Sequence, residues 1–123
     1  MITGVGIDIV KVNRMERWLV NSKLLQRYFH HDEIEFIFSR GKSAVQSLAA
    51  KFAAKEAFGK ALGTGLANIA LKDIMILSDN GKPEIKLCGT AQKALEKSGA
   101  NRMHISLTHE TENAVAMVVL EEA

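Results

Sequence analysis

The chain contains the stretch Val45-Gln-Ser-Leu-Ala-Ala-Lys-Phe-Ala-Ala-Lys-Glu-Ala-Phe-Gly-Lys60, in which apolar residues recur at the spacing of a helix. At about 100° per residue, Leu48, Phe52 and Glu56 fall within one narrow arc of that helix. Glu56 therefore stands where the next core residue is expected, and Lys60, four residues further on, is its neighbour on the helix surface. Most such Glu–Lys pairs are solvated and contribute only about 0.3–0.5 kcal/mol. The place of Glu56 on the apolar arc distinguishes this pair from them.

A second acidic residue interrupts the apolar N-terminal segment Gly4-Val-Gly-Ile-Asp-Ile-Val10. The alternation of its side chains predicts a strand over residues 2–10. One face of this strand is apolar and the other is small and polar; the two sets are Val5, Ile7 and Ile9, and Gly4, Gly6 and Asp8. We expect the second face, which carries Asp8, to be open to a ligand.

These two acids need partners, because a buried carboxylate costs free energy unless it is paired. A divalent cation partners both carboxylates at once, and Mg²⁺ is usually held by one or two carboxylates together with phosphate oxygens of a substrate. Lys60 adds a positive charge beside them. Asp8, Glu56 and Lys60 therefore predict a site for Mg²⁺ and a bound diphosphate.

The rest of the pattern predicts an α+β fold, in which an antiparallel sheet packs with one long helix and several short helices. Helices are expected over residues 13–20, from residue 22, and over 32–41, 43–62 and 90–98; further strands are expected over 74–78, 84–87, 104–109 and 114–121. Capping residues are expected at Asn13, Asp32 and Ser43, and Gly63 is expected to end the long helix.

Two connections carry further polar residues. The segment Asp79-Asn-Gly-Lys-Pro83 predicts a turn longer than the tightest hairpin. In the last hairpin, the alternation places Ile105 and Leu107 on one face, opposite a polar face made of His104, Ser106 and Thr108. That polar face is a second candidate ligand surface.

Length and composition limit the classes of protein to which the chain can belong. At 123 residues the chain fits one domain, which we expect to span residues 1–123. A net charge of only +2 predicts no nucleic-acid binding from bulk charge, so any basic patch is local. The single Cys88 cannot form an internal disulfide, which suits a reducing compartment. The chain lacks a signal-peptide pattern and an apolar run of about 18 residues, so we expect a cytoplasmic protein without membrane association.

Taken together, these segments resemble the holo-[acyl-carrier-protein] synthase family. The resemblance is carried by Gly4-Val-Gly-Ile-Asp-Ile-Val10, Arg14, Leu48-Ala-Ala-Lys-Phe-Ala-Ala-Lys-Glu-Ala-Phe-Gly-Lys-Ala-Leu-Gly-Thr-Gly65, Gly81-Lys-Pro83 and His104-Ile-Ser-Leu-Thr-His-Glu110. It implies a 4′-phosphopantetheinyl transferase-like fold and Mg²⁺-dependent transfer of the 4′-phosphopantetheine arm of coenzyme A to a serine of apo acyl carrier protein. It also implies release of adenosine 3′,5′-bisphosphate, a role in fatty acid biosynthesis, and a homotrimer with active sites at subunit interfaces.

The resemblance also implies roles for matching residues. Asp8 and Glu56 would hold Mg²⁺ against the diphosphate of coenzyme A, and Lys60 would add positive charge there. The base that takes the serine proton stays open between Glu56 and a metal-bound water. The nucleotide would meet a loop and a polar wall, made of Gly81, Lys82 and Pro83, and of His104, Ser106 and Thr108.

Basic residues complete the comparison with the family. Arg14 matches a residue that meets the acidic helix of the carrier protein, and charge alone adds Arg17, Lys23 and Arg27 to that surface. Lys51, a candidate coenzyme A contact, stands where the family more often has Arg, so bidentate geometry is lost and the charge is kept. Gly59 replaces a common Ser at a cost in helix propensity of roughly 1 kcal/mol relative to Ala.

Two other classes of function are compatible with some of these residues. One is a different small metal-dependent phosphate-transfer enzyme, since Gly4-Val-Gly-Ile-Asp8 is similar to the first phosphate-binding strand of actin-like kinases. The chain is too short for that two-lobed fold. The other is a non-catalytic module that binds carrier protein or nucleic acid through Arg14 and its neighbours, which leaves the two acids unexplained.

Overall fold

The computed structural model describes residues 1–123, and all its strand pairs are antiparallel. The elements along the chain are β1 (Ile2–Lys11), η1 (Val12–Met15), α1 (Glu16–Leu19), α2 (Ser22–Tyr28), α3 (His31–Ser39), η2 (Gly41–Ser43), α4 (Ala44–Leu62), η3 (Leu71–Asp73), β2 (Ile74–Asp79), β3 (Lys82–Leu87), α5 (Gly89–Ser98), β4 (Arg102–His109) and β5 (Asn113–Glu121). None of the helices combines the length and the apolar character that a membrane span requires.

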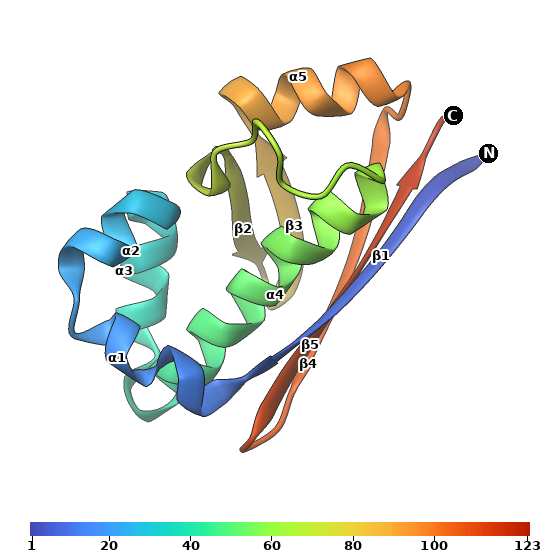
Figure 1. The fold of residues 1–123 in the computed structure, drawn as a ribbon. Helices are drawn as coiled ribbons and strands as arrows, with labels where there is room; N and C mark the ends of the chain where they lie inside the picture. Colours follow the sequence, from blue (N-terminus) through green and yellow to red (C-terminus); the bar gives the residue numbers. More distant parts are fainter.

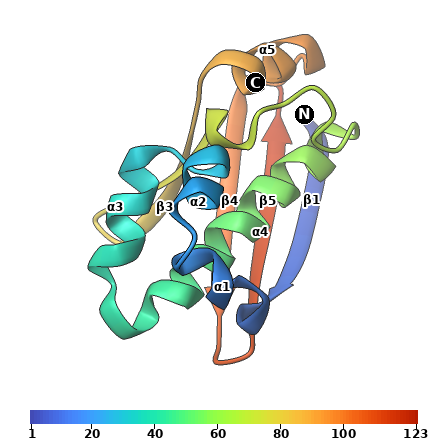
Figure 2. The ribbon, with the colours of Figure 1, turned by 60° about the vertical axis from the view of Figure 1, so that its left-hand side comes forward.

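The strands form a three-stranded sheet in the order β1-β5-β4 and a separate β2-β3 hairpin. Figures 1 and 2 show α4 lying across one face of the larger sheet, with α1, α2 and α3 gathered beside it and α5 near the two chain ends. This arrangement confirms the expected α+β class, with one long helix packed on an antiparallel sheet. The helix that carries Glu56 and Lys60 is thereby held against the strand that carries Asp8.

Two glycines allow α4 to lie directly on the backbone of β1. A Cβ atom added to Gly6 would lie 1.9 Å from the carbonyl oxygen of Ala57, and one added to Gly4 would lie 1.9 Å from that of Ala61. Real Cβ atoms essentially never approach backbone atoms below 3.0 Å, so neither position accepts a larger residue without moving the helix. The glycines of β1 and the alanines of α4 together set the distance between the two elements.

The expectation that this face of β1 is open to a ligand is wrong for its two glycines, because α4 covers them. The apolar face is the exposed one: the side chains of Val5, Ile7 and Ile9 are 55–62% exposed. Alternation assigns residues to two faces of a strand, but it does not say which face the next element covers. Gly6 is buried there, whereas Gly4 and Asp8 keep some access to solvent.

Local sequence signals predicted the ends of some helices correctly and others incorrectly. Gly63 ends α4 in the left-handed region with φ 82°, as expected. The expected side-chain caps at Asn13 and Ser43 are not formed. The expected cap at Asp32 is wrong, because the cap lies two residues earlier at His30. Its Nδ1 accepts from the backbone amide of Asp32 at 3.1 Å, and Glu33 Oε1 accepts from the backbone amide of His30 at 2.9 Å. Imidazole nitrogen takes the acceptor role that hydroxyl or carboxylate oxygen usually has.

The turn between β2 and β3 is shorter than predicted. Asp79 pairs with Lys82, so the loop contains only Asn80 and Gly81, with φ values of 51° and 82°. Two positive φ angles fit the tight turn that Asn-Gly favours, and its twist matches that of the flanking strands. Lys82 and Pro83 are consequently strand residues rather than loop residues.

Gly59 has a packing reason that helix propensity does not reveal. A Cβ atom at Gly59 would lie 2.9 Å from the carbonyl carbon of Gly65, because the chain folds back onto α4 after the helix ends. The backbone amide of Gly65 donates to the carbonyl of Gly59 at 3.0 Å. Gly59 therefore allows the backbone at Gly65 to pack against α4, where the side chain of any other residue would clash with it.

A buried ion pair ties α4 to three other elements. Lys55 Nζ donates to Glu33 Oε1 at 2.8 Å and to the carbonyls of Leu71, at 2.8 Å, and Ile74, and both charged side chains are fully buried. Glu33 Oε2 in turn accepts from the backbone amide of Ile76 at 3.1 Å. Burial lowers the pKa of Lys55, and the neighbouring Glu33 opposes that shift. The pair links α3, η3 and β2 to the helix that carries Glu56.

Candidate active site

The structure brings Asp8 and Lys60 into direct contact. Lys60 Nζ lies 3.1 Å from Asp8 Oδ1 and donates to the carbonyl of Ile7 at 3.0 Å. The Asp8 side chain is 17% exposed and the Lys60 side chain 54% exposed, so the pair lies at the rim of the β1–α4 contact. The strand thus contributes a carboxylate and a carbonyl to one ammonium group.

Glu56 lies close enough to interact with both of these charges. Burial raises the pKa of Glu56, and the negative charge of Asp8 raises it further; the positive charges of Lys60 and Arg14 oppose these effects. Two carboxylates from different elements that repel each other form a donor set suited to a divalent cation with oxygen ligands. The residues present therefore fit Mg²⁺, which would be held by Asp8 and Glu56.

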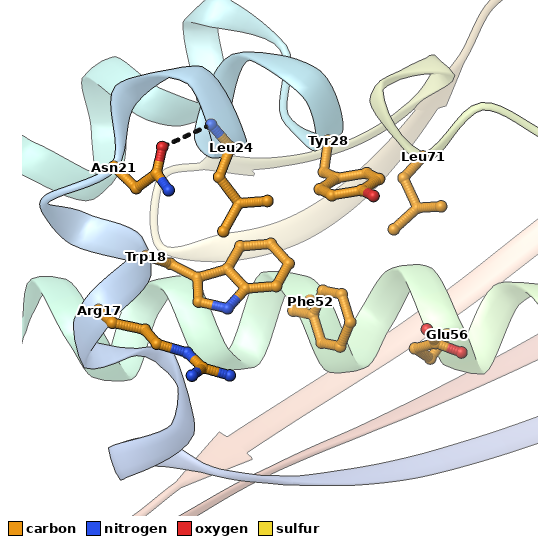
Figure 3. A pocket seen from close by; sticks show the side chains of 8 residues that line it. All are labelled: Arg17, Trp18, Asn21, Leu24, Tyr28, Phe52, Glu56 and Leu71. Atoms are coloured by element: carbon orange, nitrogen blue, oxygen red, sulfur yellow. Dashed lines mark hydrogen bonds between the residues drawn. The ribbon is translucent and has the colours of Figure 1, made fainter.

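A groove of about 670 Å³ leads away from Glu56 between α1, α2 and α4. Figure 3 shows Glu56 at one end of this groove and Arg17 further along it, with aromatic rings between them. The centroid of the Trp18 ring lies 5.3 Å from that of Phe52 and 5.7 Å from that of Tyr28. The groove thus combines an apolar wall with an acid near one end and a guanidinium near the other.

Lys51 and the β2–β3 turn line a second hollow, of about 300 Å³. Gly81 and Pro83 contribute to it, and so do Arg40 and His109, which sequence reasoning did not single out. The ammonium of Lys51 donates to the carbonyl of Ile76, and burial lowers the pKa of Lys51 to about 8. This hollow therefore gathers three of the residues predicted to contact coenzyme A.

Lys82 and His104 meet in a third hollow, of about 390 Å³, that Pro83 also lines. His104 Nε2 lies 3.0 Å from Glu121 Oε1, so the imidazole already has a carboxylate partner. Ser106 and Thr108 follow His104 on the same face of β4 and are exposed. The alternation predicted for this strand is confirmed by its register.

The predicted residues do not all converge within one chain. Asp8 pairs with Ala116, and Ala116 pairs with Leu107, so Asp8 lies on the sheet face that α4 covers. His104, Ser106 and Thr108 lie on the opposite face, which they share with the exposed Val5 and Ile7 of β1, on the far side of β5. The sheet itself therefore separates the acid pair from the polar face within one chain.

The basic residues lie near the first groove. Arg14 belongs to η1 and acts electrostatically on Glu56, and Arg17 lines the groove. Lys23 and Arg27 are exposed on α2, where the Arg27 guanidinium stands 6.0 Å from the centroid of the Tyr28 ring. The four cations therefore come from η1, α1 and α2, the elements next to the groove that ends at Glu56.

Sequence reasoning missed the aromatic wall of that groove and the buried Glu33–Lys55 pair. Phe52 precedes Glu56 by one helical turn, which was a usable signal. Trp18 and Tyr28 come from separate short helices, so no spacing within one element relates them. No local pattern relates Glu33 to Lys55, because their pairing depends on how α3 packs against α4.

The fold brings two carboxylates and a lysine together where the long helix α4 crosses the antiparallel sheet. A family model described as the 4′-phosphopantetheinyl transferase superfamily matches residues 4–118, and the chain belongs to this superfamily. A holo-[acyl-carrier-protein] synthase of Treponema denticola is 54% identical over 122 residues, which cover 98% of this chain and 99% of that protein. The resemblance drawn from the sequence motifs is confirmed.

Solved structures agree with this assignment. The crystal structure of holo-[acyl-carrier-protein] synthase from Neisseria meningitidis has a TM-score of 0.87 at 37% identity, covering 98% of this chain and 99% of that chain. The holo-(acyl-carrier-protein) synthase of Bacillus anthracis, in complex with CoA (3′,5′-ADP), has a TM-score of 0.82 at 35% identity, covering 100% of this chain and 99% of that one. The likeness therefore extends over the whole fold.

Proposed function

We propose that this protein is a holo-[acyl-carrier-protein] synthase, which transfers 4′-phosphopantetheine from coenzyme A to a serine of apo acyl carrier protein. The observation that carries the proposal is the cluster of Asp8, Glu56 and Lys60 at the β1–α4 contact. It occurs in a chain that shares 54% identity, over 98% of its length, with a protein of that name. The sequence left two alternatives, another phosphate-transfer enzyme and a non-catalytic binding module. Neither is supported by a relative of comparable identity.

In the proposed reaction, the serine oxygen attacks the β-phosphorus of coenzyme A and the bond from that phosphorus to the bridging oxygen breaks. The leaving group is adenosine 3′,5′-bisphosphate, and the serine proton goes to a base. Asp8 and Glu56 would hold Mg²⁺, which would supply positive charge to the diphosphate when bound. Lys60 adds a second cation beside it. The base stays open between Glu56 and a water molecule.

The nucleotide end of coenzyme A is proposed to use the residues that lie away from the acids. Lys51, Gly81 and Pro83 share one hollow, and Lys82 and His104 share the next. Ser106 and Thr108 extend the polar face beyond His104. The hollows supply two lysines for the phosphate groups of the nucleotide.

We propose a homotrimer whose sites combine residues of two copies. The exposed face of the sheet carries Val5, Ile7, Ile9 and Met117, which are 41–62% exposed and suit burial against another copy. The polar face of β4 continues this surface, on the side of the sheet opposite to Asp8. A second copy would bring that polar face to the acid pair.

The carrier protein is proposed to dock over Arg14, Arg17, Lys23 and Arg27. An acidic partner helix would be steered by this local cluster although the whole chain carries a net charge of only +2. The remaining proposals are that residues 1–123 form one transferase domain, and that it acts in the cytoplasm in fatty acid biosynthesis. A single hydrophobic cluster of 25 buried residues supports the one-domain proposal.

The experiment that tests the proposed function is intact-mass analysis of apo acyl carrier protein after incubation with the enzyme, coenzyme A and Mg²⁺. The carrier is expected to gain the mass of one 4′-phosphopantetheine group, and EDTA is expected to prevent the gain. A folded enzyme that leaves the carrier mass unchanged with Mg²⁺ present contradicts the proposal.

A further inference from the structure

The ammonium of Lys60 lies where a cation that uses Asp8 would have to bind. We propose that Lys60 and the divalent metal ion compete for Asp8, so that the protein holds the metal weakly until coenzyme A is bound. The inference rests on the proposed function, because it takes Asp8 as a metal ligand. It adds an order to the binding events that the family assignment does not supply.

The geometry supports direct competition at one oxygen. Lys60 Nζ lies 3.1 Å from Asp8 Oδ1 and is held in that place by the carbonyl of Ile7 at 3.0 Å. Because Asp8 is only 17% exposed, few directions of approach to its oxygens remain. A metal ion that binds Asp8 must therefore displace the ammonium or share the carboxylate with it.

Lys60 is also able to leave. Its side chain is 54% exposed, and an ion pair exposed to that degree contributes little to stability. By contrast, Lys55 on the same helix is fully buried and makes three hydrogen bonds. The competition at Asp8 is therefore expected to change metal affinity by a few-fold, which shifts the balance towards binding of coenzyme A before the metal.

The local charges indicate what draws Lys60 away. Asp8 and Glu56 carry two negative charges, and Lys60 and Arg14, which both act on Glu56, carry two positive charges. A divalent cation entering this balanced group leaves an excess of positive charge, and an anionic diphosphate restores the balance. The diphosphate also offers Lys60 new charged acceptors in place of Asp8. Metal and coenzyme A therefore each strengthen the binding of the other, by the same factor.

The test measures Mn²⁺ binding by the electron paramagnetic resonance signal of free Mn²⁺, with and without saturating coenzyme A. Without coenzyme A, Lys60→Met is expected to bind Mn²⁺ about threefold or more tightly than the wild type, as loss of a half-exposed ion pair implies. With coenzyme A, the wild type is expected to gain more affinity than Lys60→Met does. Equal Mn²⁺ affinities of the two proteins without coenzyme A overturn the proposal.

Two further variants separate direct competition from a general effect of charge. Arg14→Gln removes a nearby cation that does not bond Asp8, so its effect on Mn²⁺ affinity is expected to be smaller than that of Lys60→Met; an equal effect overturns the proposal. Lys97→Met, on α5, removes an exposed lysine elsewhere and is expected to leave Mn²⁺ binding unchanged. A matching gain in Lys97→Met also overturns it.

Asp8→Asn distinguishes failure of this inference from failure of the proposed function. Mn²⁺ binding is expected to be lost in Asp8→Asn. If it is lost there, while Lys60→Met behaves as the wild type, the competition is wrong and the transferase proposal stands. If Asp8→Asn binds Mn²⁺ as the wild type does, the metal site and the competition are both wrong. Circular dichroism melting of each variant confirms that the protein is folded.

Discussion

Replacing Gly6 by Ala tests whether the contact between β1 and α4 builds the site. The added Cβ atom would lie 1.9 Å from the carbonyl oxygen of Ala57 and 2.6 Å from the backbone nitrogen of Ala61, and neither atom belongs to a flexible side chain. Relieving the first contact to an ordinary 3.4 Å requires the helix and strand to separate by roughly 1.5 Å. Glu56 and Lys60 move with the helix, whereas Asp8 stays with the strand.

The expected cost of Gly6→Ala is about 1–3 kcal/mol of unfolding free energy, the usual range for overpacking. For a chain of this length that corresponds to a fall in Tm of roughly 4–12 °C. Because misplacement of catalytic groups by about 1 Å can cost about 10²-fold in rate, transfer activity is expected to fall by at least that factor even at temperatures where the variant is folded.

Thermal unfolding and the initial rate of carrier modification measure the two effects. Gly41→Ala is the matched control, since a Cβ atom there meets nothing within 4 Å and φ is 57°. It is expected to lose about 1 kcal/mol from backbone strain and to keep its activity. Wild-type activity in folded Gly6→Ala would refute the reasoning, because the site would then not depend on this contact.

Further predictions concern three residues, the buried Lys55 and Lys51 and the surface residue Arg14. Lys55→Met leaves Glu33 buried without its cation and is expected to lose about 3–5 kcal/mol of stability in urea unfolding; a loss below 1 kcal/mol contradicts it. The pKa of Lys51 is about 8 in the folded protein, so Lys51 loses its positive charge as pH rises through 8. The kcat/KM for coenzyme A is therefore expected to fall over that range, and Lys51→Arg is expected to move this fall to higher pH. Stability is expected to change in the opposite direction: the unfolding free energy of the wild type should rise relative to that of Lys51→Arg between pH 8 and 10.5, since the folded state binds fewer protons there. A flat difference contradicts it. Arg14→Glu is expected to raise the KM for carrier protein strongly at low salt and leave that for coenzyme A unchanged, whereas equal effects on both place Arg14 outside the docking surface.

The parts of the fold that depend on local periodicity were predictable. The alternation in β4 and the stop at Gly63 both appear in the structure as expected. Asp8 and Lys60 were expected at one site although 52 residues separate them, but their direct contact at 3.1 Å was not predicted.

Features that depend on the packing of distant elements were not predictable in the same way. The close approach of Gly4 and Gly6 to another backbone depends on where α4 lies, which no residue of β1 specifies. The Glu33–Lys55 pair forms across 22 residues, and its two members differ from surface charges only in what surrounds them. The division of the candidate site between two sheet faces likewise follows from the register of β1, β5 and β4.

The central claim is that Asp8 belongs to a metal site for phosphopantetheine transfer. The most direct measurement compares wild type and Asp8→Asn by the intact mass of apo acyl carrier protein after incubation with coenzyme A and Mg²⁺. Asp8→Asn removes a charge without removing core volume, so it is expected to stay folded and lose activity by about 10²-fold or more. The account predicts one added 4′-phosphopantetheine mass with the wild type and almost none with Asp8→Asn. Equal modification of the carrier by both proteins would contradict it.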